Sequence, residues 1–188
     1  MRFACEAPPS GKAALFALSL QEHLPTLATD RLILRAPRVT DFEAFAEIAC
    51  SERGEHIGGP MSREDAWLDF AQATATWILH GHGVWTIGHA SEVAGFVLLG
   101  FEPGDREPEL GFLLCTGAEG KGIAFEAAQA ARQYAFTELG WDTLVSYIAP
   151  ENVRSIALVR RLGARFDGVI DEAGEVAHVY RHNREVAR

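Results

Sequence analysis

The sequence lacks the features that mark disulfide-rich and membrane-spanning proteins. Its three cysteines, Cys5, Cys50 and Cys115, are odd in number and far apart, which favours reduced thiols over a disulfide framework. No apolar run approaches the ~20 residues that span a bilayer, and the first residues lack the uninterrupted apolar stretch of a signal peptide. We therefore expect a cytoplasmic protein with no membrane partner.

Positive charge is scarce. The chain has 17 lysines and arginines against 26 acidic residues, which gives a formal net charge of −9 at pH 7. A nucleic-acid-binding surface needs a basic face for the phosphates, so we expect no nucleic-acid partner. The same charge suits a cationic substrate that is drawn into an acidic cleft.

Several binding motifs are missing. His80, His82 and His89 are close in sequence, but no carboxylate or cysteine completes a recognised ligand spacing, so no metal site is predicted. A Walker A loop requires glycine where Cys115 stands, and a dinucleotide fingerprint requires glycine where Phe125 stands. Both common nucleotide-binding loops are thereby excluded.

The chain does contain the alternation of apolar runs and helical periodicities expected of one mixed α/β domain. At 188 residues it is long enough to bury a substantial core without metal or disulfide support. Residues 1–25 are the least regular part and form an N-terminal extension, with a possible helix from Gly11 to His23. Residues 26–188 form the domain.

The most informative stretch is a strand, a glycine-rich turn and a helix in succession. Glu109–Cys115 is apolar on both faces, and the next seven residues, 116–122, contain three glycines. From Gly122 alanines recur every three or four residues up to Gly140, which predicts an amphipathic helix. Free N–H groups at such a helix start favour a phosphate or pyrophosphate, although a tight turn alone also explains the glycines.

The segment Glu119-Gly120-Lys121-Gly122-Ile123-Ala124 resembles the pyrophosphate loop of the GNAT superfamily of N-acetyltransferases, whose motif is Gln/Arg-x-x-Gly/Ala-x-Gly/Ala. Glu119 departs from the motif, because the family usually has Gln or Arg there. Three further segments, Thr29–Arg35, Glu109–Phe112 and Pro150–Ser155 ahead of Leu162–Ala164, resemble the RimJ/RimL branch. The match spans roughly residues 26–182.

This resemblance implies a fold and a reaction. The fold is a central mixed, mostly antiparallel twisted sheet of about seven strands flanked by about four helices. The co-substrate is acetyl-CoA, and its acetyl group passes to a primary amine of a small molecule or a protein N-terminus by direct attack. The cofactor residues implied are Leu113, Leu114, Cys115, Glu119, Gly120, Lys121, Gly122, Ile123, Ala124 and Asn152.

Two catalytic roles follow from the same resemblance. Glu109 is the first choice of general base, with Asp171, Glu172 and Glu175 as substitutes, and Ser155 would give a proton to the departing thiolate. Simpler interpretations stay open: Asn152 as a helix cap alone, and Cys115 as a small buried residue rather than a nucleophile.

Two other functions remain compatible with the sequence. Glu119 in the loop motivates a catalytically silent acyl-CoA-binding module, and a plain anion-binding interaction domain is the third hypothesis. Antiparallel sheet edges and the N-terminal extension are also compatible with a homodimer.

Overall fold

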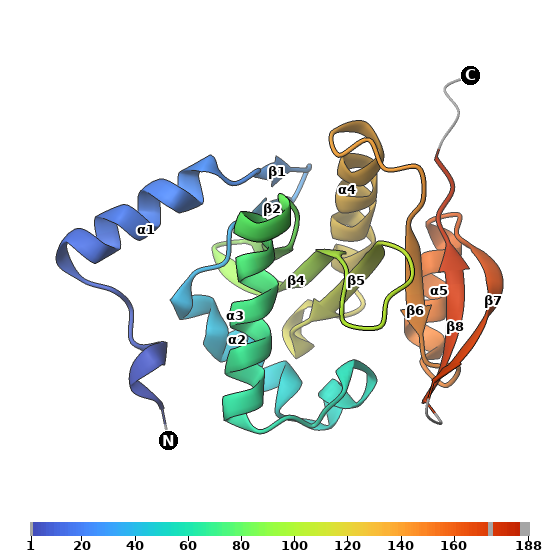
Figure 1. Cartoon of the computed structure of the whole chain (residues 1–188), viewed down its shortest axis with the longest axis horizontal. Coiled ribbons are helices and arrows are strands. Elements are labelled where there is room, and N and C mark those ends of the chain that lie inside the picture. The colour runs from blue at the N-terminus through green and yellow to red at the C-terminus, as the bar shows by residue number, and fades with distance from the viewer. Residues whose placement is uncertain (1, 173–174, 185–188) are drawn as a thin grey trace.

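The computed structural model describes residues 2–172 and 175–184, which form one eight-stranded sheet flanked by helices (Figure 1). All neighbouring strands are antiparallel except β5 and β6. In spatial order the strands are β1 (Leu27–Ala28), β2 (Leu32–Arg35), β3 (Val84–His89), β4 (Glu92–Gly100), β5 (Glu109–Leu114), β6 (Val145–Ile148), β8 (Glu175–Arg181) and β7 (Arg165–Glu172).

The predicted fold class is confirmed, with one strand more than expected. The additional strand is β1, which has only two residues and is too short to show a sequence pattern. The α-helices of the described chain are α1 (Gly11–His23), α2 (Phe42–Ala49), α3 (Arg63–His80), α4 (Ile123–Thr137) and α5 (Val153–Arg161). Short 3₁₀ segments are η1 (Ala4–Glu6), η2 (Val39–Asp41), η3 (Glu52–Ile57) and η4 (Thr116–Ala118).

Helix α4 packs closely on the middle of the sheet. Of the five alanines predicted to form its apolar face, Ala127, Ala128, Ala131 and Ala135 have no exposed surface, and Ala124 is 8% exposed. The four fully buried alanines belong to one apolar cluster with residues of β4 and β5, such as Leu110. Small side chains allow the helix backbone to approach the strands, so the start of α4 is held rigidly beside the end of β5.

The N-terminal helix α1 lies apart from the sheet, at the opposite end of the molecule from the β7–β8 hairpin (Figure 1). None of its residues is buried. Among the described residues, no helix combines the length and the apolar character needed to cross a bilayer. The expected hairpin turn between Asp171 and Gly174 falls partly outside the described residues.

Candidate active site

A cavity of about 930 Å³ opens where β5 and β6 separate. The two strands are parallel neighbours, but only Glu109 and Val145 pair across them. The walls of the cavity also include residues of η3, α3 and α5. A strand that loses its neighbour exposes backbone hydrogen-bonding groups, so β5 presents an unpaired edge to the cavity.

The glycine-rich loop lies at one end of this cavity. Gly120 and Gly122 have φ of +70° and +76°, a conformation that side-chain-bearing residues rarely adopt. A Cβ at Gly120 would meet no atom within 4 Å, so the space over the loop is open. Within the described chain, the N–H groups of Gly120, Lys121 and Gly122 donate to no backbone carbonyl. These groups, at the start of α4, are suited to an anion.

The loop is braced from behind by an ion pair between Arg31 and Glu126. Glu126, in the first turn of α4, accepts from the Thr29 hydroxyl at 2.6 Å and from Arg31 Nε at 2.7 Å. Arg31 also donates to the carbonyl oxygen of Lys121 at 3.0 Å. The turn between β1 and β2 therefore fixes the shape of the loop without using its free N–H groups.

Glu119, the residue that departs from the loop motif, is held by two arginines. Arg53 of η3 donates to one carboxylate oxygen, and Arg154 of α5 donates to the other at 2.8 Å. These hydrogen bonds, first that from Arg154 and then that from Arg53, hold the pKa of Glu119 below its usual range. All three residues line the cavity. The sequence motif drew attention to Glu119, but nothing local in the sequence indicates Arg53 as its partner.

The opposite end of the cavity is acidic. Asp69 of α3, Glu102 and Asp105 of the β4–β5 connection, and Glu109 of β5 all line it. Burial raises the pKa of Glu109 to about 8, and the nearby charges of Glu102 and Asp105 act in the same direction. The backbone N–H of Tyr147 donates to Glu109 Oε1 at 3.3 Å, which opposes the rise. A carboxyl with a pKa near the working pH is suited to proton transfer.

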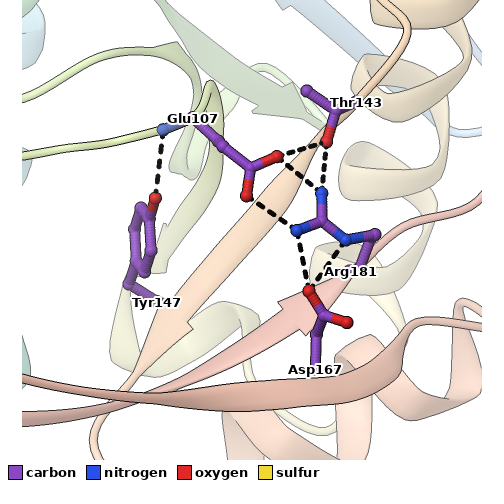
Figure 2. A network of polar contacts seen from close by, with 5 residues as sticks. All are labelled: Glu107, Thr143, Tyr147, Asp167 and Arg181. Atoms are coloured by element: carbon purple, nitrogen blue, oxygen red, sulfur yellow. Dashed lines mark hydrogen bonds and ion pairs between the residues drawn. The ribbon is translucent and has the colours of Figure 1, made fainter.

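A polar network around Glu107, two residues before Glu109, is shown from close by in Figure 2. Glu107 receives both terminal nitrogens of Arg181 at 2.6 and 2.7 Å and the hydroxyl of Thr143 at 2.7 Å. Arg181 also binds Asp167 on β7, and the hydroxyl of Tyr147 accepts from the N–H of Glu107 at 3.2 Å. The network fixes the chain at the point where β5 and β6 begin to separate.

Asn152 and Ser155 lie together at the start of α5, which forms part of the cavity wall. Asn152 Oδ1 accepts from the N–H of Ser155 at 3.1 Å, so the predicted helix cap is confirmed. Both residues line the cavity. Among the described residues, the hydroxyl of Ser155 makes no direct hydrogen bond, so it is free to face a ligand.

The family model for an acetyltransferase (GNAT) domain matches residues 31–165. This chain belongs to the GNAT acetyltransferase family. The uncharacterised N-acetyltransferase p20 of Bacillus licheniformis is 34% identical over 155 residues, covering 78% of this chain and 86% of that protein. YnaD of Bacillus subtilis, also an uncharacterised N-acetyltransferase, is 32% identical over 65 residues, covering 35% of this chain and 38% of its own length.

Solved acetyltransferase structures resemble this GNAT domain closely. An acetyltransferase from Agrobacterium tumefaciens is 38% identical, with a TM-score of 0.79, and covers 86% of this chain and 95% of that chain. RimL, described as a ribosomal α-N-protein acetyltransferase, has a TM-score of 0.71 over 86% of this chain and 95% of its own. At 17% identity, RimL shows a likeness of fold alone.

The GNAT family uses acetyl-CoA, and the cavity walls fit this group. The loop offers unpaired N–H groups below open space, and the buried Nε of Arg53 has no hydrogen-bond partner within the described chain. Both observations mark donors that lack an acceptor. Among the described residues, no group of three or more His, Cys, Asp or Glu residues could hold a metal ion.

The predicted cofactor residues of this acetyltransferase do not all face the cavity. Leu113, Leu114, Glu119, Ala124 and Asn152 line it. The remaining members of the predicted set do not: Cys115, Gly120, Lys121, Gly122 and Ile123. Neither the backbone nor the side chains of these five residues form part of the cavity wall, so their role in binding the cofactor stays a prediction.

Cys115 does not line the cavity. Its N–H donates to the carbonyl oxygen of Ala94 on β4 at 3.0 Å, so this group is not available to a cofactor. Burial also raises the pKa of the Cys115 thiol, which disfavours a nucleophilic thiolate. Of the substitute bases, Asp171 does not line the cavity, and the side chains of Glu172 and Glu175 lie outside the described part.

Proposed function

We propose that this GNAT protein transfers the acetyl group of acetyl-CoA to a primary amine by direct attack within a ternary complex. The acceptor is an amine-bearing small molecule or a protein N-terminus. One observation supports the proposal most strongly. Glu119 and Ala124, at the two ends of the glycine-rich loop, line the same cavity as Glu109, whose pKa is raised to about 8.

The chain would hold acetyl-CoA along the unpaired edge of β5. The loop from Glu119 to Ala124 would receive the pyrophosphate through N–H groups, and the backbone groups on the unpaired edge of β5 would meet the pantetheine amides as an added strand does. Asn152 stands on the facing wall. When bound, acetyl-CoA supplies the acetyl group as an activated thioester.

Two side chains would transfer protons during the reaction. Glu109 would accept a proton from the attacking amine, because its raised pKa lies close to the value of about 7.7–8.0 that is typical of an α-amino group. The hydroxyl of Ser155 would pass a proton to the leaving sulfur while it takes one from water, so that no alkoxide is left. Much of the rate gain would come from holding two substrates in one cavity.

The acidic end of the cavity favours a cationic acceptor. Asp69 and Glu102 make no ion pair with any lysine, arginine or histidine of the described chain. Carboxylates without a partner in the protein attract a charged amine and orient its approach. We also propose a cytoplasmic location, since Cys5, Cys50 and Cys115 are all free thiols.

Thermal unfolding with acetyl-CoA, ATP or NAD tests the cofactor, and CoA release with a panel of amines and N-terminal peptides tests the transfer. A selective rise of the unfolding temperature with acetyl-CoA, followed by amine-dependent CoA release, supports the enzyme. A rise without release from any amine identifies the silent acyl-CoA-binding module. An equal rise of the unfolding temperature with acetyl-CoA, ATP and NAD would indicate a general anion-binding domain.

A further inference from the structure

Glu119 connects two walls of the cavity that come from distant parts of the chain. Its carboxylate lies between Arg53, on η3, and Arg154, on α5. The three side chains differ in exposure, with 31% for Arg53, 23% for Glu119 and 70% for Arg154. This bridge of Arg53, Glu119 and Arg154 therefore lies at the rim of the cavity, near the glycine-rich loop. Water reaches it there, and the three side chains can move apart.

The bridge is not balanced in charge or in hydrogen bonds. Two guanidinium groups face one carboxylate, so one positive charge is in excess. The buried Nε of Arg53 has no acceptor within the described residues, although the same side chain also donates to the carbonyl of Leu114 at 2.9 Å. An anion with more charge and more oxygens than one carboxylate would satisfy this pair better.

We propose that Glu119 is a placeholder anion, which the pyrophosphate of acetyl-CoA displaces from Arg53 and Arg154. The inference rests on the proposed function and adds two side-chain ligands and an exchange step to it. The pyrophosphate carries two negative charges at neutral pH, so the exchange matches the two guanidinium charges. The departing carboxylate of Glu119 turns into water, and Gly120, beside it, has open space around its Cα.

The hydrogen bond from Arg53 to the carbonyl of Leu114 would hold the Arg53 side chain in place during the exchange. Arg53 stays attached to the end of β5 through the carbonyl of Leu114 while its anionic partner changes. Since Arg53 belongs to η3, which also lines the cavity, the arrival of the cofactor would be coupled to the position of η3.

The test measures binding rather than turnover. CoA, dephospho-CoA and pantetheine are titrated calorimetrically into the wild type and into Arg154→Gln, Arg53→Gln and Glu119→Gln. Dephospho-CoA keeps the pyrophosphate but lacks the 3′-phosphate, and pantetheine lacks both. Arg165→Gln and Glu138→Gln, at exposed positions that do not line the cavity, are the matched charge controls.

If Glu119 and the pyrophosphate compete for the arginines, the arginine variants should bind CoA more weakly and Glu119→Gln should bind it more tightly. Each arginine variant should bind CoA and dephospho-CoA at least about tenfold more weakly, with pantetheine binding unchanged. Glu119→Gln should bind both nucleotides about fivefold more tightly, because the competing ion pairs are gone. In Glu119→Gln/Arg154→Gln this gain should shrink, since one of the guanidiniums for which Glu119 competes is absent.

Three results would overturn the exchange. They are weaker or unchanged CoA binding by Glu119→Gln, a gain of the same size in the double variant, and arginine effects that disappear with dephospho-CoA. The last result would assign the arginines to the 3′-phosphate. A wild type that binds no CoA at all contradicts the proposed function itself, so the two failures are distinguishable.

Discussion

Replacing Glu109 with glutamine should change how the stability of the protein depends on pH. The folded state raises the pKa of this carboxyl from 4.5 to about 8. Below pH 4.5 the group is protonated in both states, so its raised pKa costs no stability there. As the pH rises to 8, only the unfolded chain loses the proton, and stability is lost progressively. At about 1.36 kcal/mol per pH unit, the loss is at most about 5 kcal/mol.

Water in the cavity reduces this loss, so we expect about 2 kcal/mol at pH 9. Glutamine has the same shape but no charge to desolvate. Urea unfolding of the wild type and Glu109→Gln between pH 4 and pH 9 measures the difference. The two proteins should be similar near pH 4, and the variant should become progressively more stable above it. Glu138→Gln, at an exposed position, controls for the loss of one negative charge. A difference independent of pH, or a wild type that gains stability relative to the variant at high pH, refutes the reasoning.

Three further predictions concern other residues of the cavity and of the network around Glu107. Ser155→Ala should lower kcat by about 10²-fold or more while calorimetry shows unchanged CoA binding, because the backbone N–H that Asn152 caps remains; an unchanged kcat removes Ser155 from the mechanism. Arg181→Gln should destabilise the fold by about 1–2 kcal/mol at pH 7 in urea unfolding. The loss should fade as the pH falls from about 4.5 towards 2, because Arg181 lowers the pKa of Glu107 to about 2; an equal loss at pH 3 contradicts this reason. Asp69→Asn should lower kcat/KM several-fold more for a dicationic diamine than for the matched monoamine, and equal effects would argue against electrostatic steering.

The local part of the site could be predicted from the sequence because its signals are local. Alanines at helical spacing predicted the buried face of α4, and three glycines in seven residues predicted the loop. The cap from Asn152 to Ser155 also spans only three residues. Each of these features depends on backbone geometry that a few neighbouring residues determine.

The side-chain contacts between distant segments could not be predicted in the same way. Arg53 and Glu119 are 66 positions apart, and Glu107 and Arg181 are 74 apart. Nothing in a single sequence says which arginine meets which carboxylate, because the pairing depends on how η3, β5 and β8 pack. The neighbouring strand that each N–H of β5 faces could not be predicted either, for another reason. Glu109–Cys115 is apolar on both faces, so no alternation showed that the N–H of Cys115 points to β4.

The position of Glu109 follows from how the sheet opens. A carboxyl whose pKa is raised to about 8 destabilises the fold at neutral pH, so its surroundings must be held by other contacts. Arg181 and Thr143 hold Glu107 on one side of Pro108, and the N–H of Val145 donates to the carbonyl of Pro108 at 2.9 Å. Immediately beyond this anchored point β5 and β6 separate. The anchoring contacts therefore allow an unfavourable carboxyl to stand at the opening of the cavity, which is where the proposed mechanism requires a proton acceptor.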